Sequence, residues 1–408
     1  MEERKGFGSN FGFLMAAIGS AVGLGNIWGF PNKMGANGGF TFLILYLVLA
    51  VFCGVIVMIG ELALGRKTGH GAIGAYRILS KKFKWLGWMG VLSAFLILGF
   101  YCALGGYCLK YVTLNVGNLF HAGFGTGTLD GAGVFDALMA NQGECVIYGL
   151  LFVAITMIIV MGGVGGGIEK VCSVGMPALF VMLVICIIRS CTLDGAVEGL
   201  KYMFIPGWAL DNGIIKEAPS FFSVLSTAGG QMFFSLSLGM AAMITYGSYM
   251  DKKKNLQKNA VVIVVMDTVV ALMAGLCVIP GRFALDPTGT LGGPSLLFVT
   301  MQNVFDRMGS VGPIFGIMFY LLVVFAAVSS SISLLEAVVA HFVDKARDQG
   351  KGDKRKAYSV LAGIAAGILC VVVCLDSLGT AGISPADILG MRGTMEKLPT
   401  WSADWLDF

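Results

Sequence analysis

Long apolar segments constrain the fold of this chain more than any other feature. Nine segments are apolar over the roughly 17–25 residues that a helix needs to cross a hydrocarbon core. They cover residues 11–35, 40–64, 88–116, 144–162, 168–190, 217–248, 258–281, 311–341 and 358–376. Because a helix satisfies its own backbone hydrogen bonds in lipid, an all-α polytopic membrane protein is predicted. A further apolar stretch, 294–306, is too short to span and is predicted to be a re-entrant or surface helix.

The composition excludes a water-soluble globule and a disordered chain. Hydrophobic residues make up 56% and charged residues 13% of the chain, against about 25% charged residues in soluble domains. The ten cysteines lie mostly inside apolar runs without the spacing of a metal site, so we interpret them as small packing residues. A single transmembrane domain over residues 1–408 is expected.

Lysine and arginine gather in alternate loops. They cluster at residues 66–84, 252–258 and 345–356, whereas residues 111–143 contain none. The positive-inside rule then places the N-terminus in the cytoplasm of a multi-pass protein of the cell membrane. These basic runs are short and lie between spans, so we do not expect a nucleic-acid partner.

Two of the nine spans are interrupted by small and polar residues. The first contains Gly19, Gly23, Gly25 and Asn26, and the sixth contains the stretch 235–239, Ser-Leu-Ser-Leu-Gly. Glycine lowers helix propensity, and unwound backbone at membrane depth is tolerated only where it lines a cavity or is buried in protein. Broken first and sixth helices predict a transporter of two inverted repeats. The first repeat would cover 11–190 and the second 217–408.

The chain contains 59 glycines, and many recur inside apolar runs rather than in linkers. Small residues let helices approach closely in a membrane. We therefore expect a packing role for Gly105, Gly106, Gly162, Gly163, Gly165 and Gly166.

Three motifs resemble one family. GSAVGLGNIWGFPNKMGANGGFTFLILYL followed by GELALGR, GQMFFSLSLGMAAMITYGSYM and FAAVSSSISLLE are similar to the first and second, sixth, and eighth helices of the neurotransmitter:sodium symporter family. The similarity extends over essentially the whole chain and is greatest to the bacterial amino-acid transporter branch with its leucine-transporter-like fold. The resemblance implies sodium-coupled symport of an amino acid by alternating access, and no enzymatic activity.

The resemblance implies two sodium sites, and sodium is a hard cation that prefers oxygen ligands. The first site would use Ala21, Asn26, Ser235 and Asp267. The second would use Gly19, Val22, Ala326, Ser329 and Ser330. The serine run alone leaves the question open, because a serine in a membrane helix often bonds its own helix backbone.

Asp267 stands inside an otherwise apolar run, where a carboxylate is a functional hypothesis by default. Many relatives have Asn here and a nearby chloride site whose serine corresponds to Ala271. We therefore expect Asp267 to supply the negative charge that chloride supplies elsewhere, so that chloride is not required. The alternative is a neutral Asp267 that is hydrogen-bonded within the bundle.

Gly23 indicates the class of substrate. Monoamine carriers of the family hold an aspartate here to pair with the amine, whereas glycine leaves room for a substrate carboxylate facing backbone N–H groups. Tyr101 matches the tyrosine that reaches this carboxylate, and an apolar pocket with one adaptable methionine predicts a hydrophobic or aromatic amino acid. The predicted substrate residues are Ser20, Ala21, Gly23, Leu24, Gly25, Ile97, Tyr101, Phe234, Ser235, Ser237, Met240, Ser330 and Leu334.

The outer gate departs from the family pattern. Relatives carry an arginine where this chain has Gly29, and that arginine pairs with an aspartate on the tenth helix. The gate is therefore expected to close either through another pairing or through Tyr101 with Phe234 alone, with Gln231 and Asp407 nearby. Two further carboxylates lie in the spans. Glu61, near the cytoplasmic end of the second span, is expected to support loop geometry, with a direct role in transport as the alternative. Glu336 either pairs within the bundle or faces water.

The chain ends at Phe408, where the family's tenth helix begins. We expect a truncated product with an incomplete second repeat, and the main alternative function is a non-transporting amino-acid-binding or partner-dependent membrane protein. An intramembrane enzyme is disfavoured because His70, His121 and His341 lie in loops or at span ends, without a paired catalytic group.

Overall fold

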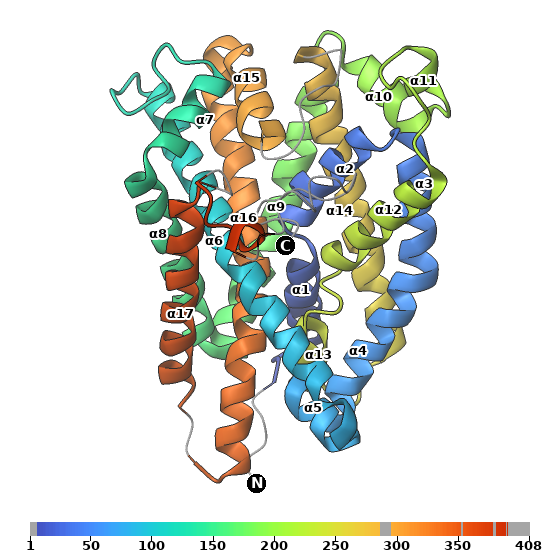
Figure 1. Ribbon diagram of the computed structural model, residues 1–408, viewed down its shortest axis with the longest axis vertical. Coiled ribbons are helices and arrows are strands. Elements are labelled where there is room, and N and C mark those ends of the chain that lie inside the picture. The colour runs from blue at the N-terminus through green and yellow to red at the C-terminus, as the bar shows by residue number, and fades with distance from the viewer. Residues whose placement is uncertain (1–5, 286–294, 352–353, 378–380, 389, 391–408) are drawn as a thin grey trace.

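The computed structural model describes residues 6–285, 295–351, 354–377, 381–388 and 390. Asp407 and the predicted start of a tenth helix lie outside the described residues. The described chain forms a bundle of long helices that run along one axis (Figure 1). The predicted all-α fold is thus confirmed.

Each of the nine predicted spans is helical. Among the described residues, seven continuous helical stretches are long and apolar enough to cross a membrane, and one bent pair adds an eighth. The sixth predicted span is broken into two halves that are each too short to be counted. The helices that form the spans are α1 (Asn10–Ala21) with η1 (Gly25–Gly29) and α2 (Phe30–Ala36), α3 (Phe40–Leu49) with η2 (Ala50–Gly54) and α4 (Val55–Thr68), α6 (Lys84–Leu119), α8 (Gln142–Met161), η4 (Val164–Ile168) with α9 (Glu169–Cys191), α12 (Phe221–Ser235) and α13 (Ala242–Tyr249), α14 (Leu256–Leu285), α16 (Gly312–Asp348), and α17 (Arg355–Leu375).

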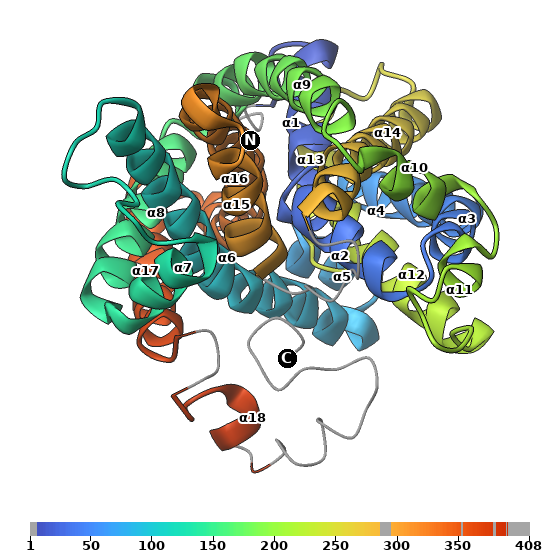
Figure 2. The same ribbon diagram turned by 90° about the horizontal axis from the view of Figure 1, so that it is seen from above.

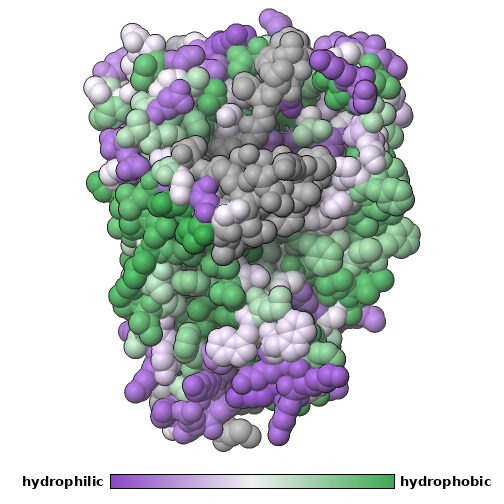
Figure 3. Space-filling view, in the orientation of Figure 1, coloured by the Kyte–Doolittle hydropathy of each residue, from purple (hydrophilic) through white to green (hydrophobic). Residues whose placement is uncertain are grey.

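Short helices occupy the two ends of the bundle. The end that we call the basic end carries α5 (Ala72–Leu79), η3 (Lys81–Phe83) and the loop 250–255. The opposite, lid end carries α7 (Gly131–Ala140), α10 (Ala196–Phe204), α11 (Trp208–Asp211), η5 (Leu296–Thr300) and α15 (Met301–Asp306). An apolar band lies between the hydrophilic ends (Figure 3), as expected of a protein that crosses a bilayer. The predicted short helix at 294–306 corresponds to η5 and α15.

Glycine permits close packing at two of the expected positions. A Cβ atom on Gly105 would meet the ring of Phe152, and one on Gly106 would meet the backbone of Gly149, so α6 and α8 pack tightly there. The expectation is wrong for Gly163 and Gly166. Gly163 has a φ of +76° in the turn before η4, and nothing lies within 4 Å of a Cβ built on Gly166. Gly163 therefore serves the turn before η4, whereas Gly166 lies within η4 without a close contact to another helix.

Both predicted helix breaks are present. The first span bends by 46° between α1 and η1. The sixth is interrupted between α12 and α13, where Ser237, Gly239 and Ala241 have positive φ values of 53°, 80° and 65°. Seen along the bundle axis, α1 lies between α14 and α16 (Figure 2). The two breaks touch, because Ser237 Oγ donates to the carbonyl of Ser20 at 2.7 Å.

Glu61 supports the second break rather than a loop at the end of its own span. Its Oε1 accepts a hydrogen bond from the backbone N–H of Gly239 at 2.7 Å. Because an unpaired N–H in a membrane costs several kcal/mol, this carboxylate satisfies backbone that the break has freed. The link also fastens α4 to the segment between α12 and α13.

Candidate functional site

A small pocket lies where the two broken spans meet. Eleven of the thirteen predicted substrate residues line it: Ser20, Ala21, Gly23, Gly25, Ile97, Tyr101, Phe234, Ser237, Met240, Ser330 and Leu334. They come from α1 and the break after it, α6, α12 and the break after it, and α16. The lining includes polar residues such as Ser20 and Ser237 and apolar ones such as Ile97, Met240 and Leu334, so the pocket combines both kinds of surface.

Leu24 and Ser235 do not line the pocket. The backbone N–H of Leu24 donates to the Tyr101 hydroxyl at 2.8 Å, so Tyr101 already bonds the unwound backbone of the first span. Ser235 points to Asp267 instead. A Cβ atom on Gly23 would overlap the hydroxyl oxygens of Tyr101 and Ser330, which means that glycine keeps this part of the pocket open.

Three of the four residues of the first predicted sodium site, all except Ala21, form one buried cluster. Asn26 Nδ2 donates to Asp267 Oδ1 at 2.7 Å, and Ser235 Oγ donates to Asp267 Oδ1 and Oδ2 at 3.0 and 2.9 Å. All three side chains are fully buried. Carboxylate, amide and hydroxyl oxygens are ligands that suit a hard cation, and a positive ion here would compensate the buried negative charge of Asp267.

The residues of the second predicted sodium site are likewise brought together. Ser330 Oγ lies 3.3, 3.1 and 3.5 Å from the carbonyl oxygens of Gly19, Ser20 and Val22. One hydroxyl has a single proton to donate, so these oxygens exceed what Ser330 can satisfy. Ser329 Oγ donates to the carbonyl of Ala326 at 3.0 Å. The cluster is rich in oxygen acceptors and carries no formal charge.

Three of the four predicted gate residues are described. Gln231 Nε2 donates to the carbonyl of Gly25 at 2.7 Å, and a Cβ atom on Gly29 would lie 3.2 Å from Gln231 Oε1. The ring of Phe234 packs over Gly25, since a Cβ there would lie 2.9 Å from its Cδ1. Gln231 thus contacts the segment from which the family's gate arginine would extend. Asp407, the fourth, is not among the described residues.

Sequence reasoning missed two polar residues beside the site. The Tyr46 hydroxyl donates to Asp267 Oδ2 at 3.3 Å, and Ser333 Oγ accepts from Ser20 Oγ at 2.7 Å. A tyrosine in an apolar run carries no distinct signal, although a buried hydroxyl usually finds a partner. Glu336, left open by the sequence, is paired: it accepts from Arg355 Nη1 at 2.7 Å and from the Tyr249 hydroxyl.

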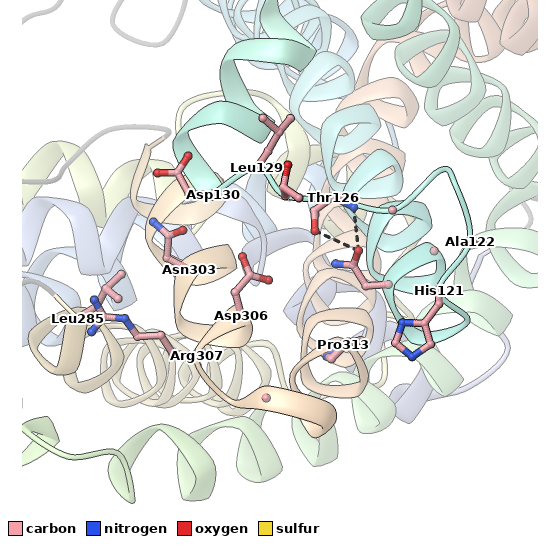
Figure 4. Close-up of a pocket in the computed structure, with 16 residues that line it drawn as sticks. His121, Ala122, Thr126, Leu129, Asp130, Leu285, Asn303, Asp306, Arg307 and Pro313 are labelled. Atoms are coloured by element: carbon pink, nitrogen blue, oxygen red, sulfur yellow. Dashed lines mark hydrogen bonds between the residues drawn. The ribbon is translucent and has the colours of Figure 1, made fainter.

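A wider hollow lies at the lid end, away from these clusters. Figure 4 shows Asp130, Asn303 and Asp306 on one side and His121 and Pro313 on the other. Burial raises the pKa of Asp306, and the nearby carboxylate of Asp130 raises it further. Among the described residues that line this hollow, none is a predicted site residue. The predicted site residues that the structure describes therefore lie away from this hollow.

The structure combines a buried carboxylate, surrounded by oxygen-bearing side chains, with a pocket where two broken spans meet. This arrangement is typical of an ion-coupled membrane carrier. The sequence model of the Sodium:neurotransmitter symporter family matches residues 4–119 and 136–390. The chain belongs to this family. It is a multi-pass membrane protein for sodium-coupled transport, and it is not an enzyme.

Curated relatives and a solved structure agree with this assignment. The chain is 35% identical over 378 residues to an uncharacterized sodium-dependent transporter, YhdH, of Bacillus subtilis, covering 90% of this chain and 78% of YhdH. A sodium-dependent transporter of Methanocaldococcus jannaschii is 32% identical, with 84% of this chain and 70% of that protein covered. The crystal structure of MhsT in complex with L-phenylalanine superposes with a TM-score of 0.82 and 38% identity, covering 94% of this chain and 84% of MhsT.

Proposed function

We propose that the protein is a symporter that couples the uptake of a hydrophobic or aromatic amino acid to two sodium ions by alternating access. The observation that supports this most is the pocket between the two breaks, which is lined by both the Gly23 segment and apolar side chains. The substrate carboxylate would face the unwound backbone near Gly23 and the Tyr101 hydroxyl. Ile97, Met240 and Leu334 would contact the substrate side chain.

The substrate class has support from a relative as well as from the pocket. MhsT was solved with L-phenylalanine, and a soft methionine such as Met240 adapts to bulky apolar groups. No acidic side chain is among the described residues that line the pocket, so the amino group of a substrate would find no carboxylate partner there other than the carboxylate of the substrate itself. This favours an amino acid over an amine without a carboxylate.

The proposed ion coupling uses both oxygen clusters. One sodium ion would bind at Ala21, Asn26, Ser235 and Asp267, and the other at Gly19, Val22, Ala326, Ser329 and Ser330. Asp267 would stay ionised and neutralise the first ion, so chloride would not be needed. A related GABA transporter of Drosophila melanogaster is sodium- and chloride-dependent, and Ala271 lies one helical turn after Asp267 in α14.

A thermal-shift screen of the twenty amino acids in sodium and in potassium chloride tests the substrate. A ligand stabilises the folded state by mass action, so hydrophobic or aromatic amino acids should raise the unfolding temperature in sodium only. Repeating the measurement with sodium gluconate in place of sodium chloride should leave that rise in unfolding temperature unchanged. A complete lack of response, or a response that is equal in potassium, would contradict the proposed site.

Uptake into proteoliposomes separates transport from binding alone. A sodium gradient should accumulate the amino acid that gave the thermal shift, with the basic end and the N-terminus facing the cytoplasm in cells. Sodium-dependent binding without accumulation would instead favour the second candidate, an amino-acid-binding membrane protein that does not transport by itself.

A further inference from the structure

The corner between α5 and α6 at the basic end has a charge that the transport mechanism does not use. Between Glu61 and Asp130 the chain has no aspartate or glutamate. Lys81, Lys82 and Lys84 lie in this stretch and are exposed. None of the three forms an ion pair with a carboxylate of the described residues. The corner therefore carries a local positive charge that nothing in its own sequence neutralises.

Two basic side chains next to this corner already bond a carboxylate, unlike the three lysines. Arg77 of α5 pairs with Asp348 at 2.8 Å, and His70 contacts the same carboxylate at 3.0 Å. These contacts tie α5 to the end of α16. The lysines of η3 and the first turn of α6 lie just beyond this paired cluster, where they are free to bind an added anion.

Exposed aromatic side chains alternate with the lysines. Phe83, Trp85 and Trp88 are 45%, 54% and 49% exposed. Trp88 also contacts His341 of α16 edge to face, with ring centroids 5.1 Å apart. Tryptophan is enriched where the hydrocarbon region of a bilayer meets its headgroups. In Figure 3 the hydrophilic surface of this end directly follows the apolar band.

We propose that this corner binds the headgroup of an anionic phospholipid. Lys81, Lys82 and Lys84 would contact the phosphate and any further negative group, while Trp85 and Trp88 would lie against the glycerol and the first methylene groups. Basic clusters next to a membrane span attract anionic lipid at about 1 kcal/mol per residue. The aromatic groups favour a lipid over a free phosphate, because only the lipid has apolar chains beside its charge.

The chain contains a matched control. Lys252, Lys253 and Lys254 are also three exposed lysines at the basic end. They follow Asp251, and the aromatic side chains before them, Tyr246 and Tyr249, are buried. Charge alone would make the two clusters equivalent. A site built from charge and exposed aromatics would exist only at Lys81–Lys84.

Native mass spectrometry of the full chain in mild detergent tests the proposal. Phosphatidylglycerol should bind at lower concentration than phosphatidylcholine. The variant K81Q/K82Q/K84Q should weaken phosphatidylglycerol binding about a hundred-fold, whereas K252Q/K253Q/K254Q should change it less than three-fold. Trp85→Leu, which keeps every charge, should weaken it several-fold. An equal loss in both triple variants, or no loss in the first, would overturn the proposal.

Two further measurements use the unaltered chain, so they do not depend on whether a variant folds. Equal binding of phosphatidylglycerol and phosphatidylcholine would also overturn the proposal. Displacement of phosphatidylglycerol by millimolar potassium phosphate, at constant ionic strength, would indicate a phosphate site rather than a lipid site and would likewise overturn it. Sodium-dependent amino-acid binding is measured separately, so failure of this proposal is distinguishable from failure of the proposed function.

Discussion

The two oxygen clusters beside the pocket are built from the same first span but differ in charge. The cluster around Asp267 holds one fully buried carboxylate, bonded by Asn26 and Ser235. The cluster around Ser330 holds only hydroxyl groups and backbone carbonyls. In the Asp267 cluster a single charged group therefore provides most of the attraction for a cation, whereas in the Ser330 cluster several neutral oxygens share it.

Because of this difference, the two clusters should respond differently to the loss of one ligand. A buried charge without a partner is costly, so the Asp267 cluster depends strongly on the ion that would neutralise it. A neutral oxygen contributes about 1 kcal/mol, so loss of one ligand in the Ser330 cluster weakens binding without abolishing it. The predictions below run from the charged cluster to the neutral one.

The largest effect is expected for Asp267→Ala. Removing a buried, hydrogen-bonded charge typically costs about 2–5 kcal/mol of binding, which corresponds to at least a thirty-fold loss of sodium affinity. The sodium-dependent rise in unfolding temperature should disappear. The control Asp306→Ala removes a carboxylate at the lid end and should leave the sodium midpoint unchanged within two-fold. A normal sodium midpoint in Asp267→Ala would show that the two clusters do not differ as argued.

If Asp267 supplies the negative charge that chloride supplies in relatives, removing that charge should make transport depend on chloride. In the variant D267N/A271S, the amide removes the fixed negative charge and the serine adds a hydroxyl one turn away on α14. Sodium-driven uptake should then fall about ten-fold when chloride is replaced by gluconate, whereas the unaltered chain should change less than two-fold. Asp267→Asn alone should be impaired in both salts. Full activity of the double variant in gluconate would argue against charge compensation by Asp267.

The lengths of apolar runs were sufficient to predict the spans, because a bilayer imposes one length on every helix that crosses it. Helices α7 and α10 were not predicted. They are 10 and 9 residues long, and isolated helices of this length are marginal without tertiary contacts. For α10 these contacts include Tyr202, whose hydroxyl donates to the carbonyl of Gly35 at 2.9 Å.

The site was predictable where the chemistry is unusual for a membrane. Glycines within the first span and Asp267 within an apolar run are exceptions that need a reason, and motif resemblance then supplied the neighbouring positions. Tyr46 was missed because its contact with Asp267 joins residues far apart in sequence, and no local pattern encodes such a pair. The turn at Gly163 was missed because a glycine that packs and a glycine that turns look alike in sequence.

Within the neutral cluster, Ser330→Ala should raise the sodium midpoint about five-fold. Its hydroxyl lies within 3.5 Å of three carbonyl oxygens of the first span, so its loss removes one oxygen from the place where they converge. Ser331→Ala is the matched control, because Ser331 bonds Thr156 and its own helix at Val328. The control should leave the sodium midpoint unchanged. Equal shifts in both variants would indicate a general effect on α16.

The smallest effect is expected for Ser329→Ala, at about two-fold in the sodium midpoint. Ser329 Oγ donates to the carbonyl of Ala326 in its own helix, so part of its bonding capacity is used without an ion, and its removal also frees that carbonyl as a ligand. Asp267 comes first in this order because it carries a charge, and Ser330 precedes Ser329 because three carbonyl oxygens of the first span converge on its hydroxyl. A larger shift for Ser329→Ala than for Ser330→Ala, measured by the same sodium titration, would mean that the ion lies nearer Ser329 than the first-span carbonyls around Ser330 suggest.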